Sequence, residues 1–308
     1  MQQTSPNNGS DSWVFDLEQL RLEHIFTRLL SQNRLAEASK LLKGFLKSFP
    51  GTAEGLSMKG RLLRVNSRFQ RGDLLIQRAI DQRAREIAES YPDADLLTRM
   101  NMFSPVLFLG GRADLFLQVG QAQHQILLDN GLQPHHKVLD VGCGCLRAGH
   151  LLIEYLDAGC YFGIEPYVLR TSFGLKHVLT HAQLEKSPTL RHHTDFSFSV
   201  FEQKFDFILA RSVWTHTSQA QICTMLNEFA RSSNERAVFL TSYVRAKNES
   251  AVYKDEGWLG RSETSEKGGY AYHSFEWIQQ QCEERSLVVE ELLEHTLNEQ
   301  IWLRISHS

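Results

Sequence analysis

Apolar residues in the first third of the chain recur at intervals of three and four positions, which is the spacing of one face of an α-helix. From Trp13 to Leu30 leucine and isoleucine follow this spacing, and a second such stretch ends at Phe49-Pro50-Gly51. Proline and glycine commonly end helices. The pattern predicts four helices, at about residues 13–30, 35–49, 53–66 and 70–89.

These four helices can be divided into two pairs that are offset by roughly 34 residues, a repeat length known for helical arrays. With Pro50 as the end of one unit, small or apolar residues occupy both sets of packing positions: Leu29, Ala38, Leu42 and Phe45, then Gly60, Leu63, Gly72, Ile76 and Ala79. The region resembles a pair of degenerate tetratricopeptide repeats, which implies a surface for a protein partner. A plain helical cap that packs on the following domain is the alternative.

Turn-forming residues at Tyr91-Pro92-Asp93 and Phe103-Ser104-Pro105 mark the predicted join to the rest of the chain. After a further helix, Ala113–Asp129, strand and helix patterns alternate to the end, as in a parallel sheet covered on both faces. We therefore predict a disordered segment at 1–12, a helical region at 13–95 and an α/β domain at 96–308.

Composition narrows the choice of partners and compartment. The 308 residues are 42% hydrophobic with a net charge of −3, so no nucleic-acid partner is expected. The polar N-terminus does not look like a signal peptide, and no apolar run approaches the roughly 20 residues that span a bilayer. Five cysteines make a poor disulfide framework, which favours a soluble cytoplasmic protein without a membrane partner.

Basic residues gather on the third and fourth predicted helices. We predict a solvated helix face, and a basic surface for an acidic partner or polyanionic acceptor is the alternative. The residues are Lys59, Arg61, Arg64, Arg68, Arg71, Arg78, Arg83 and Arg85.

The segment that follows Lys137 carries the clearest candidate chemistry. Val138–Val141 is a short apolar run of the kind that forms a buried parallel strand, and Asp140 lies near its end. Gly142 and Gly144 allow the backbone to turn tightly and to approach a ligand, and a helix pattern follows. Ligands of open α/β sheets bind at this end of the strands.

A second strand and a second acid follow the same logic. Tyr161–Ile164 is predicted as a strand, and Glu165 ends it 25 residues after Asp140. A carboxylate at this place can accept hydrogen bonds from both hydroxyls of a ribose. An acid favoured by the dipole of the helix that starts at Pro166 is the alternative.

Two cofactor classes fit this framework. Dinucleotide sites have a third glycine where this chain has Arg147, which disfavours NAD. Asp140, two residues before the glycines, favours S-adenosylmethionine (SAM), because a carboxylate there can orient the methionine end of a cofactor that has no phosphates. Cys143 and Cys145 lack a second pair of ligands for a metal site, so no metal is expected.

The segments VLDVGCG, YFGIEP and FDFILARSVWTHTS resemble class I SAM-dependent methyltransferases, of a variant found in bacteria. The resemblance covers roughly Gly110 to Arg304. It implies a Rossmann-like, seven-stranded, mostly parallel sheet that ends in an antiparallel hairpin, here Val288–Leu293 and Ile301–Ile305.

The resemblance also implies a role for particular residues. Leu146 replaces the family's third loop glycine, and Asp195 has an Asx-type turn as its alternative role. The implied cofactor residues are Asp140, Gly142, Cys143 and Gly144 in the first loop, Glu165 and Pro166 at the ribose, Asp195 and Phe196 at the adenine, and Ala210, Arg211 and Ser212 near the sulfonium.

The acceptor side is less well defined. His216 is the candidate general base, with a structural histidine as the alternative. Trp214, Tyr243 and His273 are predicted to line the substrate pocket, with further shaping by Gln300 and Trp302. The polar, glycine-containing stretch 244–269 is predicted to cover the pocket as a mobile lid.

The sequence therefore predicts a SAM-dependent methyltransferase that O-methylates a small-molecule or carbohydrate-like acceptor. Two alternatives remain open. One is an NAD-dependent oxidoreductase or epimerase on a related sheet, and the other is a non-catalytic scaffold with a vestigial methyltransferase fold.

Overall fold

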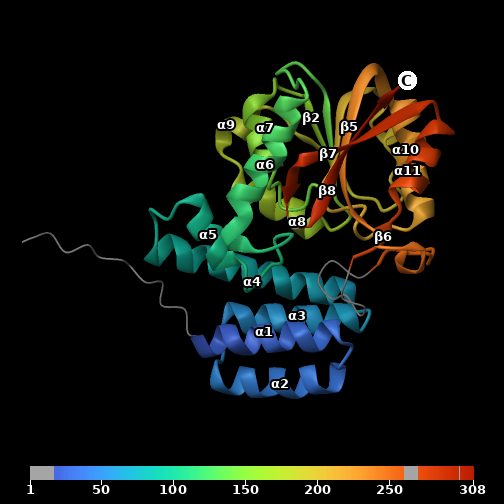
Figure 1. The fold of residues 1–308 in the computed structure, drawn as a ribbon. Coiled ribbons are helices and arrows are strands. Elements are labelled where there is room, and N and C mark those ends of the chain that lie inside the picture. The colour runs from blue at the N-terminus through green and yellow to red at the C-terminus, as the bar shows by residue number, and fades with distance from the viewer. Residues whose placement is uncertain (1–16, 260–269, 298) are drawn as a thin grey trace, which may run out of the picture.

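A computed structural model describes residues 17–259, 270–297 and 299–308 (Figure 1). The predicted disordered segment 1–12, the start of the first helix at Trp13 and the last ten residues of the predicted lid lie outside these ranges. The helical region contains four helices close to the predicted bounds: α1 (Leu17–Ser31), α2 (Leu35–Ser48), α3 (Ala53–Val65) and α4 (Phe69–Ser90).

Two glycines allow α3 and α4 to cross closely. A Cβ built on Gly60 would lie 2.7 Å from the carbonyl oxygen of Gly72, which no real side chain could tolerate. Ile76 and Ala79 are buried below this crossing. The helix pairs are thus confirmed as helices, whereas their assignment to tetratricopeptide repeats remains a prediction.

Helices then lead into the sheet and cover it. The remaining helical segments are α5 (Leu96–Phe103), η1 (Ala113–Leu115), α6 (Phe116–Asp129), α7 (Gly149–Tyr155), α8 (Val168–Phe173), the π-helix η2 (Gly174–Val178), α9 (His181–Glu185), η3 (Ser199–Phe201), α10 (Gln219–Ser232), η4 (Glu249–Ala251) and α11 (Phe275–Glu283).

The sheet has the predicted Rossmann-like form. Its strands are β1 (Val138–Val141), β2 (Tyr161–Ile164), β3 (Thr189–Arg191), β4 (Phe205–Ala210), β5 (Ser233–Arg245), β6 (Tyr272–His273), β7 (Leu287–Leu297) and β8 (Gln300–His307). Seven of them lie in the order β3-β2-β1-β4-β5-β8-β7, and β6 pairs with β5 off this path. The first five strands of the order are parallel, and β8 runs antiparallel to β5 and β7. The fold class is therefore α/β with an all-α N-terminal region.

Helices cover both faces of the sheet (Figure 1). On one face, α6 and α7 pack on alternate strand residues such as Val138 and Leu209. On the other face, α10 and α11 pack on their neighbours Leu139 and Ile208. This alternation explains why the central strands read as continuous apolar runs, since both sides of each strand are buried.

The helical region and the sheet domain share a hydrophobic core. Ile80 of α4, Phe103 of α5 and Phe173 of α8 belong to one buried cluster. Across the same junction, the Tyr167 hydroxyl donates to Asp73 at 3.0 Å. This packing matches the alternative of a helical cap on the following domain; the boundary at residue 95 remains a prediction.

The prediction of a solvated basic face on α3 and α4 is confirmed for the five residues that are exposed and wrong for Arg61, Arg64 and Arg83. The exposed residues are Lys59, Arg68, Arg71, Arg78 and Arg85. Arg83 is buried and donates to Glu54 at 2.5 Å. Arg61 is mostly buried and donates to Glu23 at 2.6 Å. The packing of these helices against their neighbours takes the guanidinium groups out of water, and the carboxylates compensate their charge.

Two further features differ from the expected elements. The helix expected to start at Pro166 begins at Val168 as α8 and continues as η2. The chain then turns at Leu179, and Thr180 caps a new helix, α9. Strand β5 extends to Arg245, into the predicted lid.

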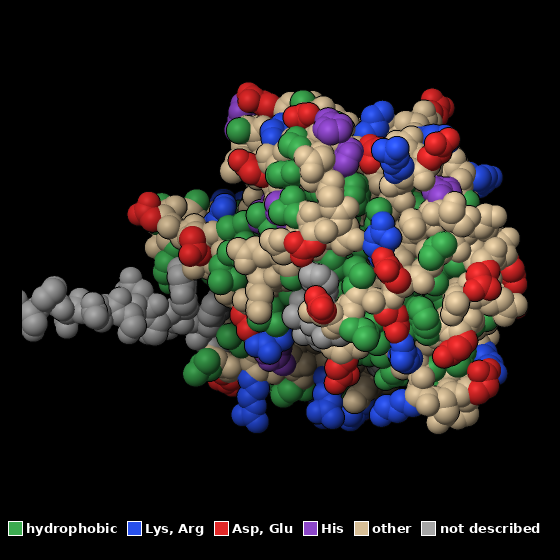
Figure 2. All heavy atoms as spheres, turned by 45° about the horizontal axis from the view of Figure 1, so that its top comes forward, with side chains coloured by type: hydrophobic (Ala, Val, Ile, Leu, Met, Phe, Trp, Pro, Cys, Tyr) green, Lys and Arg blue, Asp and Glu red, His purple; other side chains and the backbone are tan. Residues whose placement is uncertain are grey.

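The surface shows no dominant charge on the face drawn in Figure 2, where acidic and basic side chains are interspersed. Among the described residues, no helix combines the length and apolar character needed to cross a bilayer.

Candidate functional site

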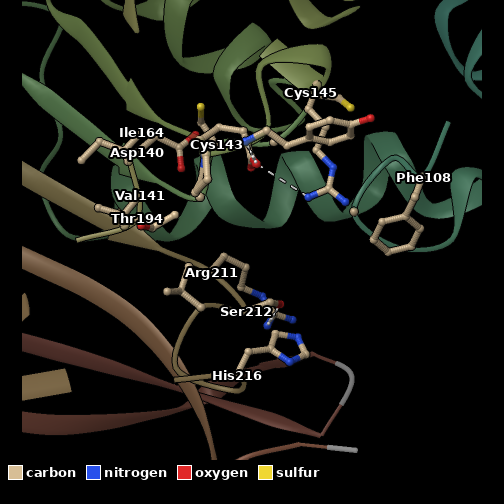
Figure 3. A pocket seen from close by; sticks show the side chains of 18 of the residues that line it. Phe108, Asp140, Val141, Cys143, Cys145, Ile164, Thr194, Arg211, Ser212 and His216 are labelled. Carbon is tan, nitrogen blue, oxygen red and sulfur yellow. Dashed lines mark hydrogen bonds and ion pairs between the residues drawn. The ribbon is translucent and has the colours of Figure 1, made fainter. Parts of the chain in front are cut away.

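A cavity of about 770 Å³ opens at the carboxyl ends of β1, β2 and β4. Asp140, Glu165 and Arg211, which follow or end these strands, line it together. The register explains this convergence, because Asp140 pairs with Gly163 on one side and with Leu209 on the other. Figure 3 shows Arg211, Ser212 and His216 facing Asp140 and Cys143 across the open space.

The loop after β1 forms one wall in a left-handed backbone path. Gly142 and Gly144 have φ values of 74° and 54°. Leu146, which follows this turn, also has a positive φ of 61°. Leu146 thus has a backbone conformation that favours glycine and is strained for other residues. The packing of its buried side chain in the core offsets this strain.

Asp140 is buried and accepts a hydrogen bond from the Tyr161 hydroxyl at 2.9 Å. Burial raises the pKa of Asp140 to about 7, although the Tyr161 hydrogen bond and the charge of Arg147 oppose this rise. The carboxyl group is therefore poised to ionise when a cation arrives beside it.

Glu165 is buried at the end of β2, and its Oε1 accepts from the backbone N–H of Tyr167 at 2.9 Å. Arg170 lies 3.7 Å from the same oxygen. Both the ribose role and the alternative of an acid near a helix start fit this geometry, because the carboxylate faces the cavity while it caps the turn before α8. Pro166 and Cys143 also line the cavity.

The two residues predicted for the adenine differ in placement. Phe196 lines the cavity, with a positive φ of 55° and its ring centroid 6.5 Å from that of Trp258. Asp195 is not among the lining residues; its side chain is 71% exposed and accepts from Ser197 N–H at 3.1 Å. This contact is the Asx-type turn that was the alternative role, and the adenine contact of Asp195 remains a prediction.

Arg211 and Ser212 line the cavity at the end of β4, whereas Ala210 does not and lies in the core below them. Arg211 donates to the hydroxyls of Ser212 and Ser242 at 3.0 and 3.1 Å. Ser212 in turn donates to Gln300 at 3.1 Å. Burial and the charge of Arg147 lower the pKa of Arg211 to about 10, so it stays protonated at neutral pH.

His216 lines the cavity, and burial lowers its pKa below the usual value. Its Nδ1 lies 3.2 Å from the Leu259 carbonyl oxygen, which can only accept. Nδ1 therefore carries the proton, and Nε2 presents a lone pair. A neutral imidazole with this tautomer can act as a general base.

The three residues predicted for the substrate pocket lie in the core instead, so that prediction needs correction. Trp214 is buried with its ring centroid 5.9 Å from that of Phe239. His273 is buried with Nε2 3.1 Å from the Trp214 carbonyl oxygen. Tyr243 is buried and donates to Glu291 on β7. None of the three lines the cavity. Trp214 and Tyr243 belong to the hydrophobic core that packs on the sheet.

Other lining residues were not predicted. Arg61, Arg64, Val65 and Phe69 bring α3 and α4 into the cavity wall, and Trp258 comes from the predicted lid. The arginines on the third and fourth helices were the sequence signal for this contribution, but a local pattern cannot show that their helix face packs against the edge of the sheet.

Among the described residues, no three His, Cys, Asp or Glu side chains cluster in a way that suits a metal ion.

No protein-family profile matches the sequence. Solved structures with a similar fold include the magnesium protoporphyrin IX methyltransferase of Synechocystis PCC 6803 with bound SAM (13% identity, 74% of this chain and 90% of that chain, TM-score 0.46). Others are a glycopeptide N-methyltransferase with SAM (9%, 61% and 94%, 0.47) and the YcgJ protein of Bacillus subtilis (12%, 61% and 99%, 0.46). These similarities are too remote to assign an activity.

Proposed function

We propose that this protein is a SAM-dependent methyltransferase. The observation that carries the proposal is that Asp140, the glycine turn after β1, and Glu165 line one cavity at the carboxyl edge of the sheet. In this proposal Glu165 accepts from the ribose hydroxyls, and Asp140 lies toward the methionine end of the cofactor. Phe196 packs on the adenine ring.

The chemistry of the cofactor favours such a site. SAM carries a sulfonium leaving group, so that positioning supplies much of the catalysis of methyl transfer. A carboxyl group with a pKa of about 7 ionises readily beside a bound cation, which makes Asp140 a suitable partner for the cofactor's positively charged end.

His216 is proposed as the general base. Its neutral imidazole can take the proton of an acceptor hydroxyl while the oxygen attacks the methyl carbon, which supports O-methylation. The cavity volume lies within the roughly 300–1,000 Å³ of small-molecule sites, which supports a small or carbohydrate-like acceptor.

The five cysteines are free thiols, which supports a location in a reducing cytoplasm.

The helical region has a proposed role in the same reaction. Because α3 and α4 contribute Arg64, Val65 and Phe69 to the cavity wall, they bound the space beside the cofactor. We propose that this region closes the acceptor site; a protein partner on its outer face remains a separate prediction.

Turnover tests the proposal. Purified protein is incubated with SAM and small-molecule extracts, and mass spectrometry follows S-adenosylhomocysteine (SAH) and products heavier by one methylene unit. We expect both to appear together, and His216→Ala to reduce them. A protein that binds neither SAM nor SAH and forms no SAH with any extract would contradict the proposal.

The control is His181→Ala. His181 lies on α9 with its side chain 88% exposed, so this change should leave turnover unaltered.

A further inference from the structure

Tyr167 connects the Glu165 carboxylate to the helical region. Its backbone N–H donates to Glu165 Oε1 at 2.9 Å. Its side-chain hydroxyl donates to Asp73 Oδ1, on α4, at 3.0 Å. Because both donors belong to one residue, a movement of α4 that displaced the hydroxyl would also displace the N–H that orients Glu165.

Arg64, on α3, holds the same tyrosine through its ring. The guanidinium carbon of Arg64 lies 4.1 Å from the centre of the Tyr167 ring, a distance at which the face of an aromatic ring attracts a cation. Arg64 also forms an ion pair with Asp73, so the carboxylate that accepts from the tyrosine hydroxyl balances the guanidinium charge. These three residues form a junction cluster that joins two helices of the helical region to the sheet domain.

The surroundings of Tyr167 show why the junction cluster matters. Arg64, Phe69 and Tyr167 line the cavity at the strand ends, and they also line a second hollow of about 450 Å³. Tyr167 therefore borders two open spaces, and its chain neighbours Pro166 and Val168 are exposed. Its side chain also packs against the buried cluster that the helical region and the sheet domain share. Contacts with the helical region thus help to fix Tyr167 in the cavity wall.

Arg170 makes the position of Tyr167 more important for Glu165. The Arg170 guanidinium is buried and lies 3.7 Å from Glu165 Oε1. Its central carbon lies 5.8 Å from the centre of the Tyr167 ring. A displaced tyrosine would therefore disturb two contacts of the Glu165 carboxylate, with its own backbone N–H and with the guanidinium beside its ring.

We propose that Tyr167 is a positioning residue for the ribose of the cofactor, and that Arg64 and Asp73 of the helical region hold it in place. This inference rests on the proposed function, in which Glu165 accepts from the ribose hydroxyls. A carboxylate that is already oriented loses less freedom when a ligand arrives, so it binds more tightly. Because coupling between sites is reciprocal, bound cofactor in turn strengthens the contact between α4 and Tyr167.

Calorimetric titrations of the full chain with two ligands test this inference. SAH is compared with its 2′,3′-dideoxy analogue, which lacks both ribose hydroxyls and so does not report on the orientation of Glu165. We expect Asp73→Ala to weaken SAH binding about tenfold and Tyr167→Phe about threefold, the range that corresponds to one weakened hydrogen bond. The affinity for the dideoxy analogue should be unchanged in both variants.

Asp81→Ala is the matched control. Asp81 also lies on α4 and also contacts the sheet domain, because Lys176 of η2 donates to it at 3.1 Å. It is not among the residues that line the cavity. We expect this variant to bind both ligands like the wild type. Equal losses of SAH affinity in Asp81→Ala and Asp73→Ala would mean that any weakening of the junction has this effect, and would overturn the inference.

A purely structural role of the junction cluster would give a different result. The inference is wrong, and the methyltransferase proposal remains, if Tyr167→Phe and Asp73→Ala lower the affinities for both ligands by the same factor or for neither. If Asp73→Ala does not fold, Tyr167→Phe decides, because it removes one hydroxyl and keeps the ring beside Arg64. A wild-type protein that binds neither ligand contradicts both the inference and the proposed function.

Discussion

At the scale of single residues, the buried carboxyl of Asp140 is the most informative group in the cavity. Among the strands that meet there, β1 is flanked by β2 and β4, which removes Asp140 from water on both sides. Burial therefore raises its pKa from 3.8 to about 7. Such a group destabilises the empty protein and favours a positively charged ligand.

Asp140→Asn should stabilise the ligand-free protein and weaken SAM binding. In the folded protein Asp140 holds its proton to higher pH than in the unfolded chain, so its contribution to stability falls as pH rises from about 4 to about 7. The asparagine removes this cost, which is at most about 4 kcal/mol for a shift of about three pKa units. Thermal melts should show the gain at pH 8 and a smaller one at pH 5.

Asp93→Asn, in an exposed loop, is the control. A lower melting temperature of Asp140→Asn at pH 8, or an unchanged SAM affinity, would show that the carboxylate does not have this role.

The pH profile of turnover tests His216. The imidazole must be neutral to accept a proton, and burial lowers its pKa below 6.5. We expect the turnover number to rise with pH through an apparent pKa below 6.5 and to be level above pH 7, and His216→Ala to lose both this rise and most of the rate, about 10²-fold. A variant that retained the same profile would exclude His216 as the base.

The place of the loop residues and of Glu165 in the cavity wall could be predicted because the signal is local. Asp140 lies near the end of β1, and Gly142, Gly144 and Glu165 follow β1 or β2 within a few positions. The register of the parallel strands brings these strand ends together. Trp214 could not be placed in this way. Its neighbours His216 and Ser212 line the cavity, but the turn after β4 directs the indole into the core, and the sequence contains no local signal for that direction.

At the scale of elements, the contact of α7 with β2 sets the position of the Asp140 carboxyl. A Cβ on Gly149 would lie 2.6 Å from the Tyr161 hydroxyl and 3.1 Å from Leu146 Cβ. The start of the helix can therefore approach the strand only because residue 149 lacks a side chain.

Gly149→Ala should displace the Tyr161 hydroxyl from Asp140 and weaken SAM binding without touching the cofactor. Overpacking of this kind costs about 1–3 kcal/mol of stability, which chemical denaturation can measure. Gly44→Ala is a matched control, because Gly44 lies within α2 and its added Cβ would meet no atom within 4 Å apart from its own helix backbone. That change should stabilise the protein by about 0.5–1 kcal/mol.

If Gly149→Ala bound SAM with wild-type affinity, the hydrogen bond from Tyr161 would not be needed to orient Asp140.

Three turn residues at the cavity edge of the sheet have a left-handed backbone conformation. Leu146, Phe196 and Ser212, which follow β1, β3 and β4, all have positive φ values. Strain of this kind collects at binding sites.

At the scale of the whole molecule, the helical region is a structural part of the sheet domain. The periodicity of apolar residues predicted each of its helices, but not the surface on which they pack, because a helix pattern shows that a face is buried and not what covers it. The shared cluster of Ile80, Phe103 and Phe173 supplies that answer.

This shared core predicts a single cooperative unfolding transition. Four of the five tryptophans, Trp214, Trp258, Trp277 and Trp302, lie in the sheet domain, so fluorescence weights that domain. Far-UV circular dichroism at 222 nm weights the helices. The two signals should have the same midpoint in urea, and SAH should shift both together. Loss of the helical signal at a lower urea concentration would mean that α1 to α4 unfold independently.

Cofactor binding is the claim on which the other functional statements depend, and calorimetry of the full chain with SAH measures it directly. We predict saturable binding by the wild type and affinity weakened about a hundredfold or more in Glu165→Ala, since two charge-assisted hydrogen bonds to the ribose are lost. Glu185→Ala, on the exposed surface of α9, should bind like the wild type. Absence of heat with both SAH and SAM, or equal affinity of Glu165→Ala and the wild type, would contradict the account.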